Sequence, residues 1–143
     1  MSFDNDFTFG VAKTVGDTLD EFDVIAAKPG FNEPEENGES AFETITEKSF
    51  AGKWKVIYFY PKDFTFVCPT EIVEFAKLTN DFADRDAVLM GGSTDNEFCK
   101  LAWRRAHPDL DKLNHHSFAD PSGNLVDMLG ARDQNSGVCL RAT

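Results

Sequence analysis

The residues best suited to chemistry in this sequence surround one of its three cysteines, Cys68. Pro69 follows it directly, and proline is favoured at the first position of a helix because that position needs no N–H donor. A helix that begins here directs its free N–H groups and the positive end of its dipole at the sulfur, which favours a thiolate. Thr65, three residues earlier, can direct its hydroxyl at the sulfur or at a bound substrate oxygen. This arrangement predicts a nucleophilic cysteine.

The number and spacing of the cysteines limit the alternatives. Cys68, Cys99 and Cys139 form no C-x-x-C pair, which argues against a zinc site or a dithiol oxidoreductase. A thioredoxin-type dithiol would place a second cysteine three residues from Cys68, where Thr65 stands. The simpler interpretation, that Cys68 is a small buried apolar residue like most lone cysteines, stays open at this point.

The composition is that of a globular protein. Of its 143 residues, 41% are apolar and 27% charged, enough for one domain with a core of its own. A net charge of −11 argues against a nucleic-acid partner, which needs clustered lysine and arginine. The N-terminus lacks the basic and apolar regions of a secretory signal, and no apolar run could span a bilayer. We therefore expect a cytoplasmic protein without a membrane partner, whose thiols are reduced and form no structural disulfide.

A strand, a helix and a second strand position Cys68. Residues 54–60 are β-branched, aromatic and almost continuously apolar until Pro61, which predicts a central strand buried on both faces. From Pro69 onward, apolar residues at three- and four-residue spacing predict one amphipathic helix as far as Ala83. A strand at residues 87–91 completes a crossover in a mainly parallel sheet. Cys68 then lies beyond the carboxyl end of a strand, where open α/β sheets place their sites.

The remaining elements are predicted from shorter patterns. Two short strands at a sheet edge, an acidic loop, two helices and two further strands are expected in the following places: Phe7–Val11 and Phe22–Ile25 (edge strands), about 27–42 (loop), a helix capped by Ser93, Thr94 or Asp95 and ending near Arg105, a strand near Ser117–Phe118, a short helix at Leu125–Leu129, and a strand that begins in Gly137–Thr143.

The segment around Cys68 resembles the active site of the peroxiredoxins. Pro61, Thr65 and Cys68 match the pattern P-x-x-x-T-x-x-C, and residues 59–72 are similar to the alkyl hydroperoxide reductase C and typical two-cysteine branch. The resemblance extends over most of the chain, through Gly16-Asp17, residues 93–98, residues 101–103 and Leu140–Thr143. It implies one thioredoxin-like domain over residues 1–143, an α/β fold with a central mixed sheet flanked by helices on both faces and incomplete at its C-terminus.

The resemblance also implies a role for each matching residue. Cys68 becomes the peroxidatic cysteine, which reduces hydrogen peroxide and alkyl hydroperoxides and becomes a sulfenic acid. Pro61 shields the sulfur from water, Thr65 donates to the peroxide, and Arg141 holds the thiolate and the peroxide oxygens. Glu71 orients Arg141, or is a first-turn acid favoured by the helix dipole. Taken alone, Arg141 would be an ordinary exposed arginine.

The same resemblance implies partners but no cofactor. Electrons would come from a thioredoxin-like protein or a dedicated disulfide reductase, and the full-length protein would form a homodimer and a ring of dimers. No metal, flavin or haem is implied. Members of this branch resolve the sulfenic acid with a cysteine near the C-terminus, and neither Cys99 nor Cys139 matches that position. We therefore expect both to be buried or interfacial thiols. We also expect the sequence to be truncated before the resolving cysteine.

Functions other than peroxide reduction are also compatible with a reactive Cys68. Cys68 could serve a redox relay, a sensor or a holdase-like oligomer without steady turnover, or the chain could be a fragment that does not fold alone. His115, His116 and Asp120 suggest a metal site only weakly, because adjacent histidines do not easily bind one ion. Trp103 could pack near the active site, although filling the core is the simpler interpretation.

Overall fold

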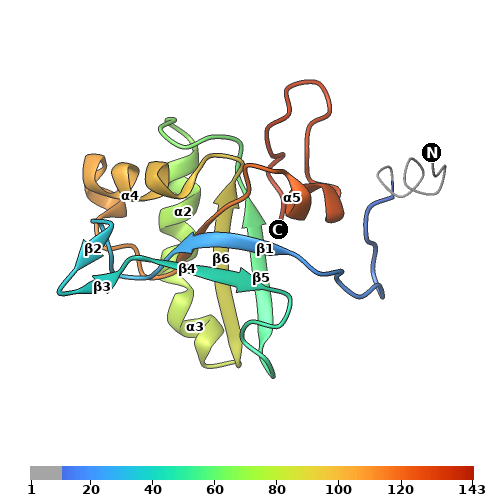
Figure 1. The fold of residues 1–143 in the computed structure, drawn as a ribbon, viewed down its shortest axis with the longest axis horizontal. Coiled ribbons are helices and arrows are strands. Elements are labelled where there is room, and N and C mark those ends of the chain that lie inside the picture. Colours follow the sequence, from blue (N-terminus) through green and yellow to red (C-terminus); the bar gives the residue numbers. More distant parts are fainter. Residues whose placement is uncertain (1–10) are drawn as a thin grey trace.

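The structure is a computed structural model that describes residues 11–143, so the strand expected at Phe7–Val11 lies almost wholly outside the described residues. Figure 1 shows the elements and their arrangement. In chain order they are β1 (Asp23–Ala27), β2 (Glu35–Glu36), β3 (Glu39–Ser40), β4 (Phe42–Thr46), β5 (Trp54–Phe59), α2 (Cys68–Lys77), α3 (Thr79–Ala83), β6 (Ala87–Ser93), α4 (Glu97–Ala106), the 3₁₀ helix η1 (Pro108–Leu110), β7 (His116–Ala119) and α5 (Asn124–Met128). Within residues 11–143, no helix has the length and apolarity needed to cross a membrane.

Five strands form a mixed sheet in the order β4-β1-β7-β6-β5. Strands β5, β6 and β7 are parallel, as the strand–helix–strand pattern predicts, whereas β1 runs antiparallel to both of its neighbours. In Figure 1, β1 and β4 cross β5 and β6 at a steep angle because successive strands of a sheet are twisted relative to one another. The predicted mixed sheet is confirmed, and β6, β7 and α5 lie within two residues of their predicted bounds.

Three strand assignments differ from the sequence prediction. Strand β1 lies inside the sheet, between β4 and β7, and not at its edge. Strand β5 is the outermost strand rather than a central one, and Trp54 at its start is 79% exposed. Strand β4 was not predicted, because Ile45 is its only fully buried residue and a single buried side chain gives no clear alternation. The acidic stretch at about 27–42 contains the small hairpin of β2 and β3.

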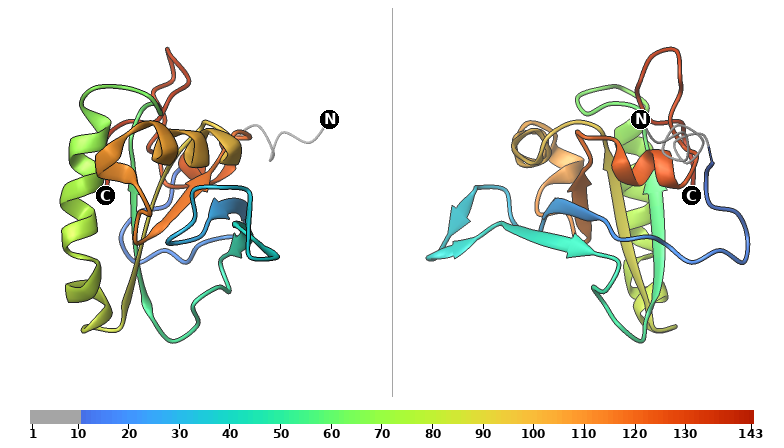
Figure 2. Two further views of the ribbon diagram at one scale, coloured as in Figure 1. Left: turned by 90° about the vertical axis from the view of Figure 1, so that its left-hand side faces the viewer. Right: turned by 45° about the vertical axis from the view of Figure 1, so that its right-hand side comes forward.

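The sheet buries two large cores, one on each face, and a third, smaller cluster consists of Ala27, Ala41 and Leu101. Successive side chains of a strand point to opposite faces, so Phe59 of β5 joins one core and Tyr58 the other. Helix α5 covers the first face with Leu125 and Val126, whereas α2 and α4 cover the second with Ile72 and Trp103. In the right-hand view of Figure 2, α5 lies in front of β5 and β6 and α2 lies behind them. Helices therefore flank both faces, as the resemblance implies.

Two helix predictions need correction. The single helix expected from Pro69 to Ala83 is two helices, because the chain leaves the regular helical path at Leu78 (φ −97°, ψ −1°) between α2 and α3. The cap of α4 is Asn96, whose side chain accepts a hydrogen bond from the Cys99 N–H at 2.9 Å. The hydroxyl of Ser93 and the carboxylate of Asp95, which were predicted to cap this helix, have other partners described below.

The last residues of the chain contact the outer edge of β5. Phe59 N–H donates to the carbonyl of Ala142 at 2.8 Å, and Ala142 N–H donates back at 3.3 Å. This antiparallel bridge and a second one between Arg132 and Cys139 replace the regular strand predicted for Gly137–Thr143. The pairing at Phe59 matters for function because it fixes Arg141 beside the carboxyl end of β5.

A buried histidine makes the stability of the fold sensitive to acid. The Tyr58 hydroxyl and His115 Nε2 share a hydrogen bond of 2.5 Å in the interior, and the imidazole tautomer determines which of the two donates. Burial, with smaller contributions from Arg104 and His116, lowers the pKa of His115 to about 3. The unfolded chain therefore binds one more proton than the fold between about pH 6.5 and pH 3.

We predict that the contribution of His115 to stability is fully present above about pH 6.5 and is lost as the pH falls, with a slope of at most about 1.4 kcal/mol per pH unit. The variant His115→Gln keeps an acceptor for the Tyr58 hydroxyl but cannot be protonated in this range. Urea unfolding at several pH values should show a shallower acid slope for the variant than for the wild type. Equal slopes would contradict a neutral buried His115.

Candidate active site

Cys68 is the first residue of α2 and its sulfur lies inside the protein. Pro69 occupies the first turn, as predicted, and Val67 before it provides no side-chain cap. Pro69 has no N–H and the Thr70 N–H donates to the Val67 carbonyl at 3.1 Å, so the start of α2 favours an anion mainly through the positive end of its dipole. The Cys68 residue is only 1% exposed and shares a core with Tyr60 and Trp103. Burial deprives a thiolate of water, so protein groups must provide the stabilisation.

Arg141 provides a full positive charge at the sulfur. Its two terminal guanidinium nitrogens, Nη1 and Nη2, each lie 3.7 Å from Cys68 Sγ. Nη1 also donates to the carboxylate of Glu71, which stands one helical turn after Cys68 on α2. The structure therefore brings together Cys68, Arg141 and Glu71, three residues predicted for the site. Glu71 contacts the guanidinium and not the sulfur, a geometry suited to orienting Arg141.

The loop between β5 and α2 carries the other two predicted residues. The Thr65 hydroxyl donates to the Lys62 carbonyl at 3.1 Å, so its partner in this structure is the loop backbone and not the sulfur. Pro61 is half-buried at the start of the loop. Phe64 has a left-handed backbone (φ 60°), which bulky residues adopt rarely, and its ring stacks on Trp103 at 5.9 Å. Trp103 thus fills the core and also contacts the active-site loop.

The other two cysteines lack such partners. Cys139 is buried, and this burial together with the nearby Asp120 raises the pKa of its thiol to about 11. Cys99 is half-exposed at the start of α4, where desolvation and the carboxylates of Asp63 and Asp95 raise its pKa. Both thiols stay protonated at neutral pH. All three cysteines are free, without a disulfide between them.

The residues weighed as a metal site have separate partners. His115 binds the Tyr58 hydroxyl in the interior, while His116 pairs with Glu43 across the sheet. His115 precedes β7 and turns into the core, whereas His116 begins β7 and faces Glu43, so the two side chains diverge. Asp120 accepts a hydrogen bond from the Val126 N–H at 2.8 Å, at the start of α5. Among residues 11–143 the structure contains no cluster of three or more side chains placed to bind a metal.

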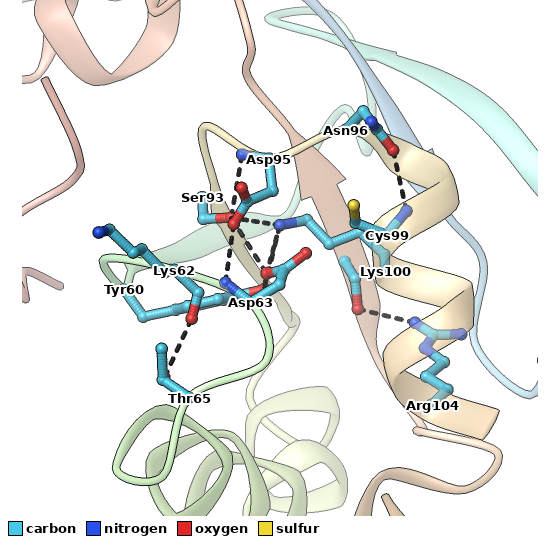
Figure 3. A network of polar contacts seen from close by, with 11 residues as sticks. Tyr60, Lys62, Asp63, Thr65, Ser93, Asp95, Asn96, Cys99, Lys100 and Arg104 are labelled. Atoms are coloured by element: carbon cyan, nitrogen blue, oxygen red, sulfur yellow. Dashed lines mark hydrogen bonds and ion pairs between the residues drawn. The ribbon is translucent and has the colours of Figure 1, made fainter. Parts of the chain in front are cut away.

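A buried polar network behind the loop was missed by the sequence analysis. It joins Asp63 of the loop to Lys100 of α4, together with Tyr60, Ser93 and Asp95 (Figure 3). One sequence signal could have revealed it, because Lys100 is four residues before Arg104 on the face of α4 that is buried. A lysine within a buried stripe needs a buried partner.

The fold and this site define the class of the protein: a thioredoxin-fold protein with a thiol-based site at the start of a helix. The chain belongs to the AhpC/TSA family, whose model matches residues 15–143. This membership confirms the resemblance drawn from the motif around Cys68.

Individual relatives agree with this membership. The chain is 42% identical over 132 residues to "Alkyl hydroperoxide reductase C" of Mycolicibacterium smegmatis, covering 91% of this chain and 67% of the relative. It is 37% identical over 116 residues to "Thioredoxin peroxidase" of Trypanosoma brucei rhodesiense, covering 79% of this chain and 58% of that protein. The solved structure of Mycobacterium tuberculosis AhpC matches with a TM-score of 0.81 and 38% identity, over 92% of this chain and 74% of that one. The chain thus spans between about half and two thirds of the curated relatives.

We predict that Arg141→Met slows the alkylation of Cys68 by iodoacetamide about tenfold at pH 7. The reason is that the thiolate loses a contact to a charged group, which contributes about 1.5 kcal/mol. The control is Arg85→Met, which removes an exposed arginine that donates to the Asp81 carbonyl. The alkylation rate can be followed by the mass of the intact protein. A rate that falls equally in both variants would show that Arg141 does not act on the sulfur.

Proposed function

We propose that this protein is a thiol peroxidase that reduces hydrogen peroxide and alkyl hydroperoxides through a sulfenic acid at Cys68. The observation that supports it most strongly is the position of Arg141, with both terminal nitrogens 3.7 Å from a sulfur that is otherwise buried. A structural cysteine needs no such cation. A nucleophilic sulfur does, because the guanidinium stabilises the thiolate and can donate to the oxygens of a bound peroxide.

The chemical step is a displacement at oxygen. The Cys68 thiolate attacks the terminal oxygen of the peroxide, an S–O bond forms, and the O–O bond breaks. The sulfur is oxidised to a sulfenic acid, and the departing alkoxide or hydroxide takes a proton and leaves as an alcohol or water. Negative charge moves from sulfur to oxygen during this step. Donors that reach both atoms therefore stabilise the transition state more than the ground state.

The proposed roles of the other residues follow from their positions. Arg141 spans the sulfur and the peroxide, and Glu71 holds Arg141 in place through the ion pair at the surface. Thr65 turns its hydroxyl from the Lys62 carbonyl to the peroxide when the substrate binds. Pro61, half-buried beside the end of β5, shields the sulfur from water.

The substrate class and partners rest on the relatives. Their names, alkyl hydroperoxide reductase C and thioredoxin peroxidase, support alkyl hydroperoxides as substrates and a thioredoxin-like protein as electron donor. A dedicated disulfide reductase is the alternative donor. We also propose a homodimer and a ring of dimers for the assembled protein. A cytoplasmic location is consistent with three free cysteines, since thiols persist in a reducing compartment.

The first test compares Cys68→Ser with Cys99→Ser. We expect Cys68→Ser to abolish the consumption of hydrogen peroxide with dithiothreitol as reductant, and Cys99→Ser to keep the wild-type rate. The trapping of a sulfenic acid by dimedone should likewise require Cys68. Undiminished peroxide consumption by Cys68→Ser would overturn the proposal. Oxidation of Cys68 that passes to a partner protein, with little turnover, would instead identify a redox relay.

A second test addresses the hydroxyl of Thr65. Thr65 and Thr70 each donate to a backbone carbonyl three residues earlier, at 3.1 Å and 2.6 Å, which makes Thr70→Val a matched control. We expect Thr65→Val to slow the reaction of Cys68 with peroxide about a hundredfold, as removal of one transition-state donor does elsewhere. Thr70→Val should remain near the wild-type rate. Stopped-flow measurement of a single turnover gives both rates, and equal rates would exclude Thr65 as the donor.

A further inference from the structure

A charged pair with no access to solvent lies behind the active-site loop. Lys100 Nζ is 2.8 Å from Asp63 Oδ1, and the two side chains are 1% and 2% exposed. Lys100 also donates to the Tyr60 hydroxyl at 3.1 Å and to the Ser93 hydroxyl. Removing two charges from water is costly, and a buried ion pair rarely stabilises a fold more than apolar residues of the same volume. Stability alone gives little reason for this pair.

Asp63 is the point at which the loop is attached. Its Oδ1 accepts hydrogen bonds from the Tyr60 hydroxyl at 2.7 Å and the Ser93 hydroxyl at 3.1 Å, besides the lysine. Its backbone N–H donates to Asp95 Oδ2 at 2.7 Å. In Figure 3 these partners come from the ends of β5 and β6 and from α4, and they converge on Asp63. Within the described part of the chain, every hydrogen bond from residues 61–66 to another element passes through Asp63.

The rest of the loop has few contacts of its own. Phe66 is 98% exposed, and Phe64 and Val67 are more than half exposed. The Thr65 hydroxyl bonds only within the loop. Asp63 stands two residues after Pro61 and two before Thr65, so its position determines where both residues lie relative to the sulfur.

Lys100 is the only cation in contact with Asp63 among the described residues. The other partners of Asp63 are neutral hydroxyl groups. Burial and Asp63 raise the pKa of Tyr60 well above its ordinary value, so this phenol stays protonated and donates a hydrogen bond. Without the ammonium group, the Asp63 carboxylate would be buried with hydroxyl partners alone. A buried carboxylate without a cation is unfavourable, so Asp63 would move to a position exposed to water and displace the loop.

We propose that Lys100 is a positioning residue: its buried ammonium holds Asp63, and through Asp63 it holds the loop from Pro61 to Val67 in the conformation from which the Thr65 hydroxyl can turn to a peroxide bound at Cys68 and Arg141. This role deepens the proposed peroxidase function and rests on it. Lys100 does not contact the reacting atoms. It acts by fixing the backbone that carries them.

The test measures two reactions of Cys68 in Lys100→Met. Reaction with hydrogen peroxide needs the loop aligned, and we expect its single-turnover rate to fall about tenfold or more, as small misplacements of reacting groups do. Alkylation by iodoacetamide does not depend on Thr65, and a displaced loop leaves the sulfur no less accessible, so the alkylation rate should not fall. The control Lys77→Met removes an exposed lysine paired with Glu74, and both rates should match the wild type. A folded Lys100→Met variant that reacts with peroxide at the wild-type rate would overturn the proposal.

A double variant covers the case in which Lys100→Met does not fold, since that change leaves the Asp63 carboxylate buried without its cation. Lys100→Met with Asp63→Asn removes both charges, and circular dichroism should show a native fold. If the ion pair only stabilises the fold, the folded double variant should react with peroxide at the wild-type rate. A positioning role predicts that the peroxide rate stays about tenfold low while alkylation is retained; a normal peroxide rate would refute it.

The wild type and Cys68→Ser are measured in the same series to separate the two proposals. A wild type that does not consume peroxide contradicts the peroxidase function itself. An active wild type together with an equally active Lys100→Met contradicts only the role of Lys100.

Discussion

Cys68 is 1% exposed, and the burial of this residue governs the chemistry of the whole site. A thiolate in such a place has lost the solvation of water, so protein groups must replace it. The start of α2 contributes the positive end of a helix dipole, and Arg141 contributes a guanidinium from a position 73 residues later in the chain. The two meet because Ala142 pairs with Phe59 at the outer edge of β5, where α2 begins a few residues later.

Two charged pairs flank the loop that leads to Cys68, and they differ in their access to water. Arg141 and Glu71 pair at the surface, where water weakens the attraction and leaves the guanidinium able to engage a substrate. Lys100 and Asp63 pair in the interior, where the attraction is strong and the cost of separating them is high. The first pair is therefore suited to contact with a reacting molecule. The second is suited to holding the backbone in one position.

The three cysteines illustrate how surroundings decide the chemistry of a residue type. Cys68 has an arginine and a helix start as neighbours, whereas Cys139 faces Asp120 and Cys99 lies near two carboxylates. Negative neighbours and burial disfavour the thiolate, so the pKa values of Cys99 and Cys139 are raised. The family to which the chain belongs was evident from the motif at Cys68, but the contrast between the three thiols appears only in three dimensions.

Local features of the fold follow from the amino-acid pattern. The proline after Cys68 placed the start of α2, and the apolar patterns placed β5, β6, β7 and α5, because periodicity and backbone restrictions act between near neighbours. The pattern left the order of strands undecided, so β5 was expected at the centre of the sheet although it lies at the edge. The network around Lys100 and Asp63 was also invisible, since a single lysine within an amphipathic helix gives no sign of the partner it will meet. Strand order and the partners of Lys100 depend on contacts between residues far apart in the chain, and a buried charge takes its role from the residues that packing brings to it.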